Sequence, residues 1–220
     1  MKKPFKGIIF DMDGLLFDTE SLYCQANMKI APKHGIKNYD EEYYRGLIGL
    51  SDEETAEIYY EDFAEAGRTA IDAFILEGHL EVKEMFLAGL APIKPGVIEI
   101  LTYLKAEKIP CIVASSNLRQ FIDILLEKAE IRRYFIDIIS GDDVAKAKPD
   151  PEIVHKALAK LELAPEECLM LEDSRNGILA SYRAGVPVIM VPDMIAPTPE
   201  VAEMTLEILP SLHEVINYLK

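Results

Sequence analysis

Residues 6–14 read KGIIFDMDG, a short apolar run that ends in Asp11, Met12, Asp13 and Gly14. A run that is nearly continuous in Ile and Phe is typical of a strand covered on both faces. Asp11 and Asp13 stand two positions apart, so their carboxylates point the same way. Because such neighbours raise each other's pKa unless a cation lies between them, the stretch predicts a site for a hard divalent ion such as Mg²⁺. The alternative interpretation is an acidic turn in which Gly14 supplies backbone freedom.

Short apolar runs alternate with helical patterns along the rest of the chain. Further strands are predicted at residues 110–114, 135–140, 168–171 and 187–191, with a weaker one at 206–209. Helices are predicted at residues 96–107, 119–129, 151–161, 175–184 and 212–219. This alternation is the signature of an α/β fold with a parallel sheet.

The segment 18–91 interrupts this alternation. It contains no convincing strand and is rich in Glu, Ala, Tyr, Ile and Leu at helical spacing. It separates the first strand from the second by about a hundred residues, which is too long for a plain crossover. We therefore expect an α/β core domain made of residues 1–17 and 92–220, and a helical cap domain made of residues 18–91.

Composition limits the classes of protein to which the chain can belong. The 220 residues carry a net charge of −15, and half of them are hydrophobic. Such a chain can bury a core without disulfides, which excludes a disordered protein or a disulfide scaffold. The charge argues against nucleic acid or an anionic membrane as a partner, although a local metal or donor cluster can still bind a small anion. With three scattered cysteines and no apolar stretch of about 20 residues, we expect a cytoplasmic protein. We also expect a monomer.

A second polar cluster, Ser115-Ser116-Asn117, follows the predicted strand 110–114 and precedes a helix. Hydroxyl and backbone N–H groups at a strand-to-helix turn can bind an anion. The alternative interpretation is plain N-capping of the following helix.

Two more clusters follow later strands. Lys148 lies in a stiff turn, because Pro149 disfavours a helical conformation for it, and Pro151 with Asp150 as N-cap is expected to start the next helix. Glu172 and Asp173 end the predicted strand 168–171, where two adjacent carboxylates are costly unless they are solvated or bind a metal. The alternatives are a solvated lysine and an acidic surface turn.

All four clusters stand at the carboxyl ends of predicted parallel strands, where ligands bind in open α/β sheets. Together they supply metal ligands, phosphate donors and a carboxylate that could act as a nucleophile. This inventory suits phosphoryl transfer, in which catalysis is mostly positioning and charge stabilisation.

The chain strongly resembles the haloacid dehalogenase-like (HAD) superfamily, in its β-phosphoglucomutase-like and sugar-phosphatase branch with a helical C1 cap. Four motifs carry the resemblance in order: DMDGLLFDTE at 11–20, VASSN at 113–117, AKPDP at 147–151 and LEDSRNG at 171–177. It implies a Rossmann-like core with strand order 3-2-1-4-5, counting the five strong strands, and right-handed crossovers.

The resemblance also implies roles for individual residues. Asp11 would be the nucleophile that forms an aspartyl-phosphate. Asp13 would protonate the leaving alcohol and then activate water. The implied Mg²⁺ ligands are Asp11, the backbone carbonyl of Asp13, Asp173 and, directly or through water, Glu172. The implied phosphate-binding residues are Ser115 and Lys148, with Ser116 and Asn117 nearby.

A phosphatase acting on a small phosphorylated metabolite, such as a sugar phosphate or nucleoside monophosphate, is the preferred function. The similar β-phosphoglucomutases carry a basic cap loop, whereas the corresponding residues 48–52 (IGLSD) contain no Lys or Arg, and Tyr23 replaces a histidine. A mutase remains the alternative, because Arg45 or Lys83 could supply the second cation. A catalytically silent binding module is the third hypothesis, and the presence of Asp11 and Asp13 argues against it.

Overall fold

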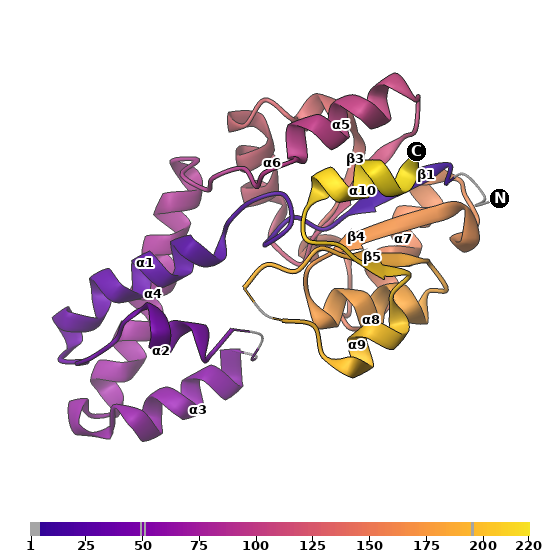
Figure 1. Cartoon of the computed structure of the whole chain (residues 1–220). Helices are drawn as coiled ribbons and strands as arrows, with labels where there is room; N and C mark the ends of the chain where they lie inside the picture. Colours follow the sequence, from indigo (N-terminus) through magenta and orange to yellow (C-terminus); the bar gives the residue numbers. More distant parts are fainter. Residues whose placement is uncertain (1–4, 49, 51, 195) are drawn as a thin grey trace. The chain divides into compact units, whose positions relative to one another are not determined.

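The computed structural model describes residues 5–48, 50, 52–194 and 196–220 of the chain. The chain divides into two compact units, Met1–Asp18 with Pro92–Lys220 and the inserted Thr19–Ala91. Figure 1 shows the elements of each unit. The assignment of the two units as a core domain and a cap domain stays a prediction.

The first unit is built on a six-stranded sheet in the order β3-β2-β1-β4-β5-β6, and all of its strand pairs are parallel. The strands are β1 (Gly7–Phe10), β2 (Cys111–Ala114), β3 (Phe135–Ile139), β4 (Cys168–Glu172), β5 (Val188–Met190) and β6 (Glu207–Ile208). The predicted order is confirmed, and the weak candidate at 206–209 adds β6 at the edge. Because β1 pairs with both β2 and β4, Asp11 follows an interior strand at the point where the strand order reverses.

The helices of this unit are α5 (Val97–Ala106), α6 (Arg119–Lys128), α7 (Glu152–Leu161), α8 (Arg175–Arg183), α9 (Pro199–Met204) and α10 (Leu212–Leu219). Short 3₁₀ turns are η3 (Arg132–Tyr134), η4 (Gly141–Asp143) and η5 (Pro165–Glu167). Five helices match the predictions closely. The sequence analysis missed α9, because six residues are too few to show a helical period; Thr198 caps it and Pro199 starts it.

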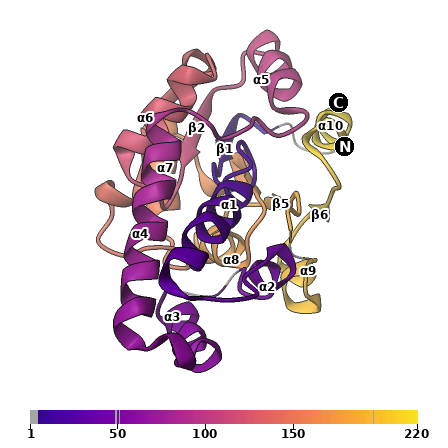
Figure 2. The same ribbon diagram turned by 90° about the vertical axis from the view of Figure 1, so that its left-hand side faces the viewer.

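Helices lie on both sides of this sheet. Ile9, Ile112 and Met170 are adjacent in the strand register and are fully buried in one cluster with residues of α7 and α8. Helices α5 and α10 pack on each other, and they lie on the side of the sheet away from α8 (Figure 1 and Figure 2). The buried strands therefore read as continuous apolar runs.

The inserted unit is helical in its described residues, as the sequence predicted. Its elements are α1 (Glu20–Ile30), η1 (Ala31–His34), α2 (Glu41–Arg45), α3 (Asp52–Asp62), η2 (Ala64–Ala66) and α4 (Arg68–Leu87). Its aromatic core includes Tyr39, Tyr59 and Phe74, and the hydroxyls of Tyr39 and Tyr59 lie 2.7 Å apart. Gly78 of α4 lets Asn27 of α1 approach, because a Cβ there would lie 2.5 Å from the Asn27 Oδ1.

Two further features bear on the expectations from composition. Cys24, Cys111 and Cys168 are all buried and free. Among the helices in the described part of the chain, none is both long enough and apolar enough to span a membrane.

Candidate active site

The loop after β1 holds Asp11 and Asp13 in a tight turn. The Asp11 N–H donates to the Leu171 carbonyl at 3.1 Å, so the end of β1 is fixed to β4. Gly14 has φ +80° and its N–H donates to the Phe17 carbonyl. A Cβ on Gly14 would lie 2.1 Å from the Asp173 Oδ2, so only glycine lets the two acidic motifs approach this closely.

Lys148 is buried against two carboxylates. Its ammonium donates to the Asp11 Oδ1 at 2.5 Å and to the Glu172 Oε1 at 2.9 Å, and its side chain is 5% exposed. Burial lowers the Lys148 pKa, but Asp11 and Glu172 together raise it above its ordinary value. Lys148 therefore stays protonated at neutral pH, and the solvated-lysine interpretation is wrong.

The loop that carries Lys148 is held by the first residue of α7. The Ala145 and Lys146 N–H groups both donate to the Glu152 carboxylate, and the Glu152 N–H donates to the Asp150 Oδ1. The helix begins at Glu152 with Pro151 as its N-cap residue, one position later than predicted. Asp150 still accepts a hydrogen bond from the first turn, as a capping side chain does.

Glu172 is the last residue of β4, and Asp173 follows it. Glu172 is 1% exposed, and its Oε2 accepts from the Ser174 N–H at 2.6 Å. Ser174 caps α8 by accepting from the Gly177 N–H, which leaves Asp173 without a capping role. The interpretation of this pair as an acidic surface turn is therefore wrong for Glu172.

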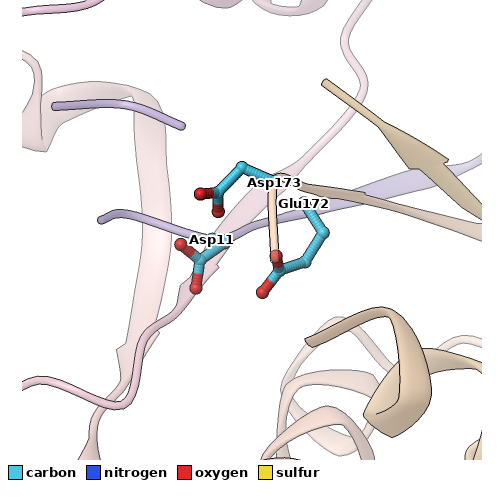
Figure 3. Close-up of side chains that lie close together, drawn as sticks. All are labelled: Asp11, Glu172 and Asp173. Atoms are coloured by element: carbon cyan, nitrogen blue, oxygen red, sulfur yellow. The ribbon is translucent and has the colours of Figure 1, made fainter. Parts of the chain in front are cut away.

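The carboxylates of Asp11, Glu172 and Asp173 converge on one point (Figure 3). One oxygen from each lies within 4.8 Å of the other two, and the Asp173 Oδ1 is buried without a hydrogen-bond partner among the described residues. Burial raises the pKa of Asp11 and of Asp173 well above the usual range; Glu172 adds to both shifts and Lys148 opposes both. Three carboxylates close to one ammonium leave an excess of negative charge, which a bound divalent cation would balance. Because all the ligand atoms are oxygens, the site suits a hard cation such as Mg²⁺.

Ser115 and Asn117 hold Asp13. The Ser115 hydroxyl donates to the Asp13 Oδ2 at 3.1 Å, and the Asn117 Nδ2 donates to the Asp13 Oδ1 at 3.4 Å. Ser115 is fully buried, whereas Ser116 is exposed. Neither serine caps α6, because its N-cap residue is Leu118, and the Ser115 Oγ accepts from the Asn117 N–H outside the helix. The structure thus brings together every predicted site residue except Ser116, whose side chain is exposed.

Asp193 lies at the same edge of the sheet, three residues after β5, and the sequence analysis missed it. Its side chain is 10% exposed and forms an ion pair with Lys94. The signal in the sequence that could have identified it is an acidic residue two positions after the fifth apolar run, but this residue belongs to none of the four motifs.

Replacing Gly177 by alanine is expected to destabilise the protein, although the same change inside a helix ordinarily stabilises it. A Cβ there would lie 1.6 Å from the Glu172 Oε1, and overpacking of a buried site costs about 1–3 kcal/mol. Urea unfolding measures the effect. Asn176→Ala, on the exposed side of α8, is the control. A Gly177→Ala protein as stable as the wild type would show that Glu172 is not held as described.

Comparison with known proteins shows the family to which the chain is related. The family profile of the haloacid dehalogenase-like hydrolases matches residues 8–191. A phosphorylated carbohydrates phosphatase of Thermotoga maritima is 34% identical over 181 residues, which cover 82% of each protein.

Solved structures agree. A candidate beta-phosphoglucomutase from Thermotoga maritima superposes with a TM-score of 0.81 at 31% identity, covering 97% of this chain and 98% of the other. CbbY from Rhodobacter sphaeroides, solved with phosphate, gives 0.75 at 27% identity and 96% coverage of both chains. The resemblance drawn from the four motifs is confirmed: the chain belongs to the haloacid dehalogenase-like hydrolase family.

Proposed function

We propose that this protein is a Mg²⁺-dependent phosphatase that hydrolyses a small phosphate monoester, of the phosphorylated-sugar class, through an aspartyl-phosphate. The observation that carries the proposal is the position of Asp11, which is buried, pairs with the Lys148 ammonium and belongs to an acidic cluster with Glu172 and Asp173; Asp13 follows two residues later. The Thermotoga maritima relative named for phosphorylated carbohydrates supports the substrate class.

Asp11 is the proposed nucleophile. One of its carboxylate oxygens forms a bond to phosphorus while the bond from phosphorus to the substrate alcohol breaks. The Lys148 ammonium, 2.5 Å from the Asp11 Oδ1, stabilises the negative charge that gathers around the transferring group. Because the Glu172 Oε1 accepts from the same ammonium at 2.9 Å, Lys148 is fixed before substrate binds.

Asp13 is the proposed acid and base. Without substrate, its two oxygens take the donors of Ser115 and Asn117. Phosphoryl oxygens that enter the site compete for these donors, which releases Asp13 to reach the leaving oxygen. Asp13 then gives that oxygen a proton and later removes one from the water that hydrolyses the aspartyl-phosphate.

The proposed direct ligands of Mg²⁺ are the carboxylates of Asp11 and Asp173 and the backbone carbonyl of Asp13. Glu172 is assigned a positioning role, because its two oxygens already accept from Lys148 and from the Ser174 N–H. The ion supplies positive charge that offsets the charge of the phosphate and of its own carboxylate ligands.

A mutase is the second candidate, because one structural neighbour carries the name of a beta-phosphoglucomutase. The segment 48–52, which lacks Lys and Arg, favours the phosphatase. Gly49 and Ser51 of this segment lie outside the described residues. Arg45, one alternative cation, is paired with Glu41 at 2.7 Å. A silent binding module is disfavoured by the assembled Asp11, Lys148 and Asp173.

A turnover screen with Mg²⁺ over sugar phosphates, nucleoside monophosphates and both glucose phosphates tests the proposal. Phosphate release and isomerisation are followed separately. Release of phosphate from a sugar phosphate without isomerisation is the expected result. Interconversion of the two glucose phosphates without net release would instead show the mutase, and no turnover of any substrate would favour the binding module.

Replacing Asp173 by asparagine is expected to raise the Mg²⁺ concentration needed for half-maximal activity and to lower the maximal rate. The amide loses the negative charge that the cation site uses, and the Asp173 Oδ1 has no hydrogen-bond partner among the described residues. The measurement is phosphate release across a Mg²⁺ titration. Full activity of this variant at low Mg²⁺ would show that Asp173 is not a ligand.

A further inference from the structure

Lys94 and Asp193 form a partly buried ion pair that the proposed mechanism does not use. The side chain of Lys94 is 22% exposed and that of Asp193 is 10% exposed. Removing two charged groups from water costs more free energy than forming an ion pair at an exposed position. An ion pair with so little solvent exposure must therefore be held by the residues around it. Its position therefore needs an explanation beyond surface charge.

Backbone hydrogen bonds tie both partners to the acidic cluster. The Lys94 N–H donates to the Leu16 carbonyl at 3.0 Å, which joins it to the loop that carries Asp11 and Asp13. The Val191 N–H, two residues before Asp193, donates to the Glu172 carbonyl at 2.8 Å. The pair thus joins the two loops that present the proposed metal ligands.

Asp193 has one oxygen paired and one oxygen unpaired. Lys94 occupies the Oδ1, whereas the Oδ2 is buried and has no partner within the residues that the structure describes. The same is true of the Asp173 Oδ1. A buried acceptor without a donor costs about 1–3 kcal/mol, and more when it is charged. Two such oxygens at one edge of the sheet call for donors from outside the chain.

Asp193 is too far away to be a direct ligand with the other three carboxylates. The group whose oxygens lie within 4.8 Å of one another contains Asp11, Glu172 and Asp173 but not Asp193. It is still close enough for its negative charge to raise the Asp173 pKa. This places its carboxylate beyond direct coordination but within reach of the cluster's electrostatic field.

We infer that Asp193 is a positioning residue for the divalent cation, accepting a hydrogen bond at its Oδ2 from a water molecule bound to that cation. The inference rests on the metal-dependent function proposed above. Mg²⁺ keeps several of its waters in proteins, and carboxylates that hold such outer groups orient the ion. Lys94 occupies the Oδ1, which leaves the Oδ2 as the oxygen that can accept from such a water.

Isothermal titration of the metal-free full chain with Mg²⁺ tests this role. Loss of an outer partner typically lowers metal affinity 10–100-fold, so Asp193→Asn is expected to raise the Mg²⁺ Kd by about that factor. The rise in Tm that Mg²⁺ causes is expected to shrink in parallel. Asp123→Asn removes the same charge from an exposed position on α6 and is expected to keep the wild-type Kd.

A different result is expected if the ion pair has only a structural role. Its loss would then lower the Tm of the metal-free Asp193→Asn protein and leave the Mg²⁺ Kd unchanged, and this outcome would overturn the inference. If the single variant fails to fold, the double variant Lys94→Gln with Asp193→Asn removes both charges, and the same rise in Kd is expected.

Asp173→Asn separates this inference from the proposed function. Weakened binding in Asp173→Asn together with a wild-type Kd in Asp193→Asn would overturn the role of Asp193 alone. A wild-type chain that binds no Mg²⁺ would overturn both the proposed cofactor and the role of Asp193.

Discussion

Replacing Asp11 by asparagine is expected to abolish turnover, with a loss of about 10⁴-fold or more, the scale that follows removal of a nucleophile. The amide cannot attack phosphorus, and no phosphorylated protein is expected to form. The fold is expected to survive, because Lys148 keeps the Glu172 carboxylate as its partner at 2.9 Å. Phosphate release and mass spectrometry of the protein after mixing with substrate measure the two effects.

Asp123→Asn is the matched control for this change, because it makes the same substitution at an exposed helix position. It is expected to retain wild-type turnover. Circular dichroism and thermal unfolding show whether Asp11→Asn is folded. A folded Asp11→Asn protein that still releases phosphate at a substantial fraction of the wild-type rate would assign the nucleophile to another group.

Replacing Asp13 by asparagine is expected to slow sugar-phosphate hydrolysis by about 10²–10⁴-fold, the usual contribution of general acid and base catalysis. An aryl phosphate has a leaving group that needs little protonation, so Asp11 is still expected to be phosphorylated by it. The intermediate then persists, because no base activates the water that would hydrolyse it. The Ser115 hydroxyl can donate to the new amide oxygen as it does to Asp13, which preserves the loop.

Rapid mixing of Asp13→Asn with an aryl phosphate and Mg²⁺, followed by peptide mass spectrometry, locates the phosphoryl group. It is expected on Asp11, and the double variant Asp11→Asn with Asp13→Asn is expected to carry none. A phosphoryl group on another residue, or undiminished hydrolysis of sugar phosphates by Asp13→Asn, would contradict the division of roles between the two aspartates.

The sequence by itself determined the sheet and the edge at which the site lies. Apolar runs such as 168–171 indicated strands buried on both faces, and the resemblance to the haloacid dehalogenase-like family implied their order, with Asp11 after an interior strand. The polar residues after each run therefore had to meet at one edge of the sheet. That is why Asp11, Lys148 and Asp173 could be singled out although they are far apart in the chain.

Local pattern did not determine how these side chains are used. Ser115 before a helix suggested an anion site or a helix cap, yet its hydroxyl donates to Asp13, 102 residues away. Glu172 suggested a ligand or a surface turn, yet both of its oxygens are occupied, and Gly177 leaves the space that it fills. Such contacts depend on which loops the sheet brings together and not on neighbours in sequence.

Only the tertiary structure showed Asp193. A single acidic residue after a strand carries no pattern of its own, and its pairing with Lys94 joins positions 99 residues apart. What distinguishes it is a buried oxygen that no described group satisfies, as is also the case for one oxygen of Asp173. Burial and hydrogen-bond satisfaction are properties of the packed chain, because desolvation depends on every element around the group and not on the residue type alone.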